Sequence, residues 1–159
     1  METFSLKTSV AVIAAAFVAV PSTFAAVVYD NTAPSSDQGR IFNFDNNLEI
    51  GDQIILAGSD RRITEFSFNY VFNPGEGLSI GNETITFSIY ANNGAGGAPG
   101  DLLLTSGPVA IPGGPDLKSF TALGLSLDVP TTFTWTVTFG GIDAGESAGL
   151  FIFDPPTVG

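Results

Sequence analysis

The segment Thr131 to Phe139, TTFTWTVTF, constrains the fold more than any other part of this sequence. Phe133, Trp135, Val137 and Phe139 alternate with threonines, so an extended strand would present one apolar and one polar face. A helix would scatter these side chains around its circumference, whereas a pleated strand gathers them on one side. We therefore expect a half-buried strand here, with the apolar face packed in a core.

The same period of two recurs in residues 63–72 and 83–90, where aromatic and branched side chains again alternate with polar ones. Shorter strands are expected at residues 27–29, 41–44, 53–57, 102–105, 119–127 and 149–153. The stretch 91–101 is rich in Gly and Asn and is expected to be a loop, while the prolines in 107–116 favour a turn or an edge-strand connection.

About nine short strands separated by turns predict two antiparallel sheets packed face to face. The fold class is thus an all-β sandwich that is jelly-roll-like, with an immunoglobulin-like sandwich as the alternative. The expected core residues are Phe66, Phe68, Tyr70, Phe87, Ile89, Phe133, Trp135, Val137 and Phe139.

The first 25 residues have the three-part layout of a secretory signal peptide. A polar start containing Lys7 precedes the apolar run 8–20, and Thr23 and Ala25 provide small residues before a cut at Ala26. The apolar run of about 13 residues is shorter than the ~20 that span a bilayer. We therefore expect residues 1–25 to be removed by signal peptidase, and residues 26–159 to form one domain without a membrane span.

Composition excludes several classes of function. The chain contains no Cys and no His, which rules out a Ser-His-Asp triad, a thiolate nucleophile and a zinc site built on Cys or His. Its net charge of −11 would repel phosphate backbones, so we expect no nucleic-acid partner.

Two carboxylates, Glu65 and Glu83, lie on or beside expected strands and could project from one sheet as a glycosidase pair does. No motif supports that pairing, and an outward glutamate on a strand is usually a solvated surface residue. We therefore expect a protein that is not an enzyme.

Candidate binding residues cluster beside the Gly-rich loop 91–101. Tyr90 is the best surface aromatic for stacking on a sugar ring, and Asn92 and Asn93 follow it with hydrogen-bonding amides. These three residues define a possible ligand site, which would make the domain a carbohydrate-binding module.

Oxygen-bearing side chains near the expected strand ends suggest a second kind of site, because Ca²⁺ takes six to eight oxygen ligands. The best candidate ligands are Asp30, Asp45 and Asp154, with Asn31, Asn46, Asn47, Glu49 and Asp52 nearby in sequence. No EF-hand spacing is present. We expect no cofactor, with structural calcium as the alternative.

Several stretches together resemble the exported β-sandwich proteins of Gram-negative bacteria that carry a PEP-CTERM sorting tail. They are 28–31 (VYDN), 56–58 (LAG), 62–68 (RITEFSF), 89–94 (IYANNG), 98–103 (APGDLL), 133–137 (FTWTV) and 154–159 (DPPTVG). The resemblance implies export, recognition by an exosortase through a C-terminal Pro-Glu-Pro motif and apolar helix, and a role at the cell surface or in exopolysaccharide. The sequence contains no Pro-Glu-Pro motif and no second hydrophobic segment.

The end of the sequence reads as a loop leaving a strand, because Pro155 and Pro156 cannot donate ladder hydrogen bonds. We therefore expect the sandwich to be incomplete at Gly159 and the reading frame to continue, first through a closing strand and then into an anchor. The expected function is that of a non-catalytic secreted or cell-surface domain with a structural role, whose partner is extracellular polysaccharide or matrix.

Overall fold

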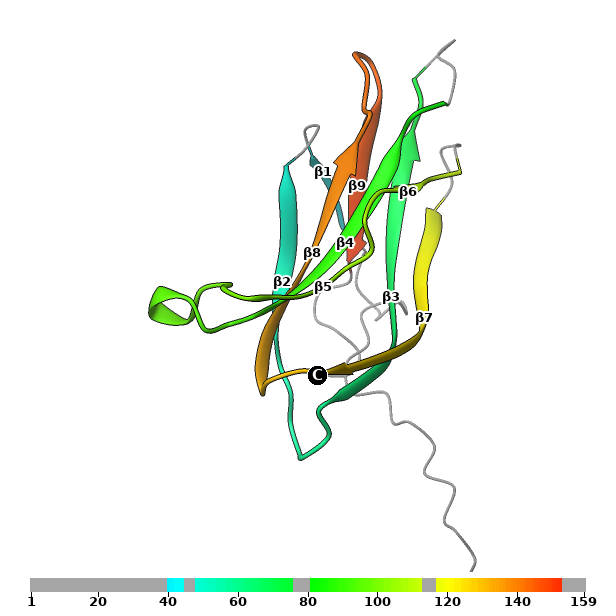
Figure 1. Cartoon of the computed structure of the whole chain (residues 1–159). Helices are drawn as coiled ribbons and strands as arrows, with labels where there is room; N and C mark the ends of the chain where they lie inside the picture. The colour runs from blue at the N-terminus through cyan, green and yellow to red at the C-terminus, as the bar shows by residue number, and fades with distance from the viewer. Residues whose placement is uncertain (1–39, 45–47, 76–80, 113–116, 153–159) are drawn as a thin grey trace, which may run out of the picture.

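The computed structural model describes residues 40–44, 48–75, 81–112 and 117–152, and side chains are described for 48–75, 81–112 and 117–151. Strands make up most of these ranges, and the single 3₁₀ turn η1 (Ala95–Gly97) is the only helical element within them (Figure 1). The strands are β1 (Arg40–Phe44), β2 (Glu49–Ile55), β3 (Arg62–Asn73), β4 (Thr84–Ala91), β5 (Leu102–Thr105), β6 (Val109–Ala110), β7 (Leu117–Asp128), β8 (Thr132–Gly140) and β9 (Ser147–Ile152).

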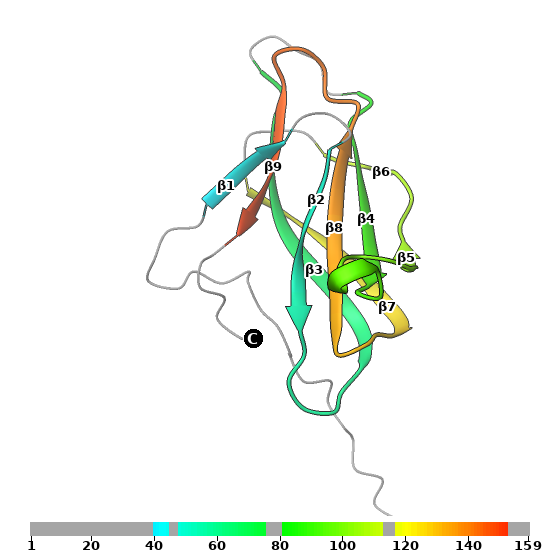
Figure 2. The same cartoon turned by 90° about the vertical axis from the view of Figure 1, so that its left-hand side faces the viewer.

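The strands form two antiparallel sheets that pack face to face. One sheet has the order β1-β9-β3-β7, and the other has the order β2-β8-β4-β5, with β6 pairing beside β5 on β4. Figure 2 shows the second sheet toward the viewer, with β3 and β7 behind it. The sequence-based prediction of a two-sheet antiparallel sandwich is confirmed.

The strand pairings are nested around one hairpin. From the inside outward, β4 pairs with β5, β3 with β7, β2 with β8 and β1 with β9. In the sequence, each pair therefore encloses the pair named before it. This is the pattern of a long antiparallel hairpin wrapped into two sheets, which defines a jelly roll. The jelly-roll prediction therefore holds over the immunoglobulin-like alternative, and the Gly-rich loop 91–101 is the tip of the wrapped hairpin.

The core lies between the inner faces of the two sheets and is mainly aromatic. Phe87 of β4 stacks on Phe66 of β3 with ring centroids 4.8 Å apart, and Trp135 of β8 lies 5.6 Å from Phe68. Phe120 of β7 stacks on Phe68 at 5.0 Å. These contacts join β3 and β7 of one sheet to β4 and β8 of the other, so the aromatic rings hold the layers together.

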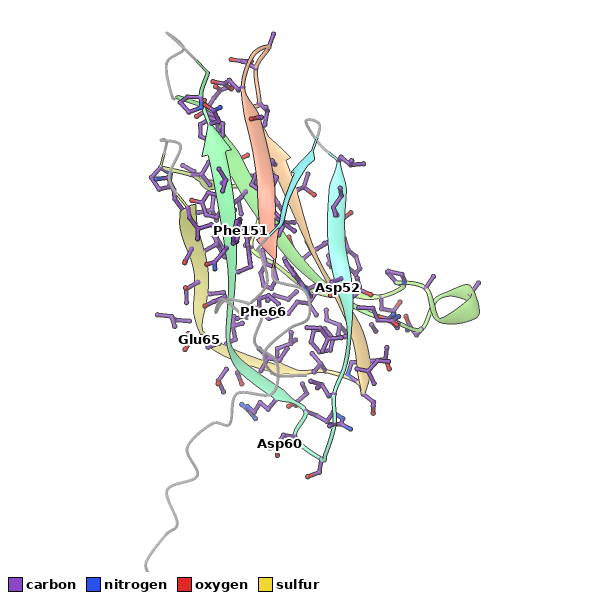
Figure 3. The ribbon with its side chains drawn as sticks, turned by 180° about the vertical axis from the view of Figure 1, so that it is seen from behind. Asp52, Asp60, Glu65, Phe66 and Phe151 are labelled. Atoms are coloured by element: carbon purple, nitrogen blue, oxygen red, sulfur yellow. The ribbon has the colours of Figure 1, made fainter. Side chains whose placement is uncertain are left out.

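Eight of the nine predicted core residues are buried, and the exception is Phe66, which is only partly buried. Figure 3 shows Phe66 pointing between the sheets and its neighbour Glu65 pointing away from them. β9 pairs with β3 only from Asn69 to Asn73, so its pairing stops short of Phe66. The ring therefore packs against the core without being fully enclosed.

The alternating segments 63–72, 83–90 and 131–139 were predicted to within one residue of β3, β4 and β8, and the expected strand 119–127 lies within two residues of β7. The expected strand 53–57 is wrong in position, because β2 runs from Glu49 to Ile55 in register with β8. Pairing with β8 overrides the weak local pattern around Gly51 and Asp52. The expected strand 27–29 and the leader lie outside the described residues. Over the described ranges, no helix has the length and apolar character needed to cross a bilayer.

Candidate functional site

The candidate site lies on the outer face of the β2-β8-β4-β5 sheet, next to the tip loop 91–101. We call this outer face the hydroxyl face, because most of its side chains carry hydroxyl groups. Its hydroxyl-bearing residues are Thr84, Thr86, Ser88, Thr105, Thr132, Thr134, Thr136 and Thr138. The alternation that sends Phe133 and Trp135 into the core sends these threonines outward. Figure 2 shows the tip loop and η1 projecting from this side of the sandwich.

The centre of the hydroxyl face is covered, although it points away from the core. Thr134 and Thr136 are each 8% exposed, and Ser88 is 7% exposed. Glu49 of β2 and Tyr90 of β4 contribute to this cover, because their side chains meet over Thr136. The threonine hydroxyls at the centre of the face are therefore not an open surface for a ligand.

Tyr90 forms much of that cover. Its hydroxyl donates to Oε1 of Glu49 at 2.8 Å, and the Thr136 hydroxyl donates to the same oxygen at 2.6 Å. Tyr90 lies opposite Thr134 and Glu49 opposite Thr138, so the Tyr90–Glu49 bond crosses β8 above Thr136. The predicted ligand aromatic thus ties the outer strand β2 to β4 across the sheet.

The hydrogen bond has a consequence for the acidity of Tyr90. Burial raises the pKa of its phenol first, and the hydrogen bond to Glu49 and the negative charge of that residue raise it further. A phenol with a raised pKa stays neutral near pH 7 and keeps its role as donor. This environment favours a structural hydroxyl and not a catalytic phenolate.

The tip loop is held by its two asparagines. The Asn93 amide donates to Oδ2 of Asp101 at 2.6 Å, and its carbonyl oxygen accepts from the Asp101 backbone N–H at 2.9 Å. Asn92 donates to the Gly97 carbonyl at 3.0 Å and accepts from the Thr134 hydroxyl at 3.0 Å. Asn93 thereby closes the base of the loop, while Asn92 fixes the loop to β8.

Glycine allows two parts of this site to approach closely. A Cβ atom at Gly51 would lie 1.7 Å from the carbonyl oxygen of Trp135, so only glycine lets β2 lie this close to β8. In the loop, Gly96 and Gly97 adopt φ values of 68° and 81°, which favour glycine. The Gly-rich composition of 91–101 therefore reflects turn geometry.

The two carboxylates considered as a catalytic pair are not on one sheet. Glu65 lies on β3 and is exposed, whereas Glu83 precedes β4 in the other sheet. The expectation that Glu83 is solvated is wrong, because it is 2% exposed. Its Oε2 accepts from the Gly81 backbone N–H at 2.9 Å, and its backbone carbonyl accepts from Ile111 at 3.1 Å. The contacts of Glu83 thus fix the start of β4 beside the segment that follows β6.

The candidate calcium ligands Asp30, Asp45 and Asp154 lie outside the described residues, so calcium binding stays a prediction. In the part of the chain that the structure describes, no three or more carboxylates gather where they could hold a metal ion. Glu49, which also figured among the nearby oxygen ligands, is instead the acceptor for Tyr90 and Thr136.

The sequence suggested Tyr90, Asn92 and Asn93 as one group of residues. It did not suggest the two carboxylates that accept hydrogen bonds from this group, Glu49 from Tyr90 and Asp101 from Asn93. Asp101 could have been found, since Asn93 and Asp101 bracket a glycine cluster and Asx side chains commonly close such turns. Glu49 carries no local signal, because it meets Tyr90 only through the pairing of β2 with β8 and of β8 with β4.

Comparisons of the chain with protein-family models, curated proteins and solved structures found no match.

Proposed function

We propose that this chain is a non-catalytic, exported domain with a structural role at the cell surface or in extracellular matrix. The observation that carries the proposal is that Tyr90, Asn92 and Asn93 are all engaged in hydrogen bonds within the protein. Side chains that a ligand would need to recruit are instead used to brace the sheet and its tip loop.

Freeing these groups for a ligand would cost free energy. A ligand that took over the Asn93 amide or the Tyr90 hydroxyl would have to break an existing bond to a carboxylate. Hydrogen bonds to charged groups are worth about 1.5–3 kcal/mol in proteins, less where solvent screens them. A site selected for binding would leave such groups available, whereas a structural module benefits from saturating them.

The exported and surface-associated part of the proposal rests on the sequence. The leader 1–25 and the resemblance to PEP-CTERM proteins support passage through signal peptidase and retention near exopolysaccharide. The acidic surface suits a protein that stays soluble in that environment.

A carbohydrate-binding module is the second candidate, and one observation favours it. The Tyr90 side chain is only partly buried, and Tyr90 directly precedes the tip loop, so its ring could stack on a sugar there. Stacking uses the face of the ring and leaves the hydroxyl free to keep its bond to Glu49.

Two measurements test the proposal. Fractionation of cells producing the chain should recover it outside the cytoplasm, in the surface or exopolysaccharide fraction. A glycan array probed with the purified chain should then show no saturable binding. Recovery in the cytoplasm would contradict the exported role.

Saturable glycan binding that is lost in Tyr90→Ala would favour the carbohydrate-binding module. The matched control is Leu102→Ala, because Leu102 lies opposite Tyr90 on β5 and is 51% exposed. Glycan binding that falls equally in both variants would reflect a disturbed loop and not stacking on Tyr90.

A further inference from the structure

The strand β7 has the features of an interaction edge. Among the described strands it pairs only with β3, so it is one of the two outer strands of the β1-β9-β3-β7 sheet. It is twelve residues long, and two of its leucines are exposed, Leu117 at 49% and Leu123 at 70%. A long edge strand with exposed apolar side chains is a template for pairing with another strand.

The regular part of this edge ends at Leu123. One β3 residue lies between Ile63 and Glu65, whereas three β7 residues, 124–126, lie between their partners Leu127 and Leu123. The register shift is a β-bulge that starts at Gly124, whose φ is 68°. The bulge interrupts the ladder, so the segment open to a partner strand is Leu117–Leu123, which we call the β7 edge.

Charge distinguishes the β7 edge from β2, which is one of the two outer strands of the other sheet. β2 carries Glu49 and Asp52, and two copies of an acidic strand would repel each other in a chain of net charge −11. The β7 edge contains no carboxylate, and its one charged residue is Lys118. The edge strands β1 and β5 also lack carboxylates, but they have five and four residues, so the β7 edge is the longest edge segment without a carboxylate among the described strands.

The β7 edge is also self-complementary. In an antiparallel pair with the two-fold axis at Phe120, Leu117 of each copy lies opposite Leu123 of the other, and Ser119 lies opposite Thr121. This register uses the whole segment up to the bulge, with apolar side chains against apolar ones and hydroxyls against hydroxyls. Hydrogen bonds to β3 already fix both hydroxyls, with Ser119 donating to Asn69 at 2.7 Å and Ser67 to Thr121 at 3.0 Å.

We propose that the chain forms a symmetric dimer in which the β7 edges of two copies pair antiparallel around Phe120 and join their β1-β9-β3-β7 sheets. Such an isologous contact closes on itself, so it gives a dimer and not a fibre. The proposal stands on the geometry of β7 and does not depend on the proposed function.

A charge-swap experiment tests both the interface and its register. Sedimentation velocity of the purified chain should show a monomer–dimer equilibrium. The variant L117E/L123E places two carboxylates opposite each other on both sides of the axis and should weaken dimerisation at least about tenfold. The variant L117K/L123E places opposite charges at the same positions and should dimerise markedly better than L117E/L123E.

The matched control is L48E/I55E, with Leu48 directly before β2 and Ile55 at its end, since these side chains are 48% and 68% exposed. It should leave the dimer intact, and far-UV circular dichroism should show all variants folded. Hydrogen exchange should slow within residues 117–123 as the concentration of the unmodified chain rises. A wild-type chain that stays monomeric at millimolar concentration would overturn the proposal. Equal weakening of the dimer by L117E/L123E and L117K/L123E would overturn the register. Equal weakening by L117E/L123E and the control L48E/I55E would overturn the interface.

Discussion

Trp135 offers a quantitative test of the core, because its indole is buried while its N–H has no partner. The side chain is 4% exposed, and its ring lies 5.3 Å from Phe66 and 5.6 Å from Phe68. Among the described residues its Nε1–H has no hydrogen-bond partner. Trp135→Ala should lose about 3–5 kcal/mol of the free energy of unfolding through lost packing and the cavity left behind.

Trp135→Phe separates packing from the orphaned donor. Phenylalanine keeps an aromatic ring between the sheets and removes an N–H whose burial without a partner costs about 1–3 kcal/mol. The loss in Trp135→Phe should therefore be less than half of the loss in Trp135→Ala. Packing of Phe66 and Phe68 against a ring is retained in the first variant and absent from the second.

Urea unfolding followed by far-UV circular dichroism is the suitable assay, since Trp135 is the only tryptophan and its fluorescence disappears with it. The slope of the free energy against urea should stay constant across the variants. Ile55→Ala, at a side chain 68% exposed, is the control and should cost about 1 kcal/mol or less. Equal losses in Trp135→Phe and Trp135→Ala would contradict this expectation, because they would mean that a phenyl ring at this position recovers none of the lost stability.

Three further predictions concern the site and the leader. Gly51→Ala should lower the urea midpoint by displacing β2 from β8, whereas Gly81→Ala, with no atom within 4 Å of the added Cβ, should be nearly neutral. Burial raises the pKa of Tyr70 and of Tyr90 above the ordinary value of 10.0, so the folded chain holds these protons more tightly than the unfolded chain. Stability should therefore be complete below about pH 10 and fall as pH rises through the raised pKa values, and Tyr90→Phe should reduce that fall in urea titrations. N-terminal sequencing of exported protein should begin at Ala26, and a chain that retains Met1 would contradict the signal-peptide assignment.

Much of the fold could be predicted because the long strands alternate apolar and polar residues with a period of two. In β8 and β4 every second residue is aromatic or branched, so the pattern identifies both the strand and its buried face. The tip of the hairpin was equally clear, since Gly and Asn dominate residues 91–101. Weaker segments such as β2 depend on a partner strand, which is why its position was mispredicted.

Only part of the candidate site could be predicted from the sequence, because its other residues meet through strand pairing. Tyr90, Asn92 and Asn93 are neighbours in sequence, and a surface aromatic beside amides is an ordinary binding pattern. Glu49, the partner of Tyr90, and Thr134, the partner of Asn92, reach them through sheet register, which local sequence does not encode. Glu83 was mispredicted because a glutamate beside a strand is usually solvated, whereas here the Gly81 N–H holds it in a buried position.

We propose that the ligand-like side chains at the tip loop serve the fold. A double-mutant cycle of Asn93→Ala and Asp101→Ala tests it most directly, because it isolates the bond of 2.6 Å between Nδ2 and Oδ2 from other effects of each substitution. We expect a coupling free energy of about 0.5–1.5 kcal/mol in urea unfolding, a range reduced from that of buried bonds because both side chains are exposed. Zero coupling, with both single variants as stable as the unmodified chain, would contradict the claim that these residues brace the loop.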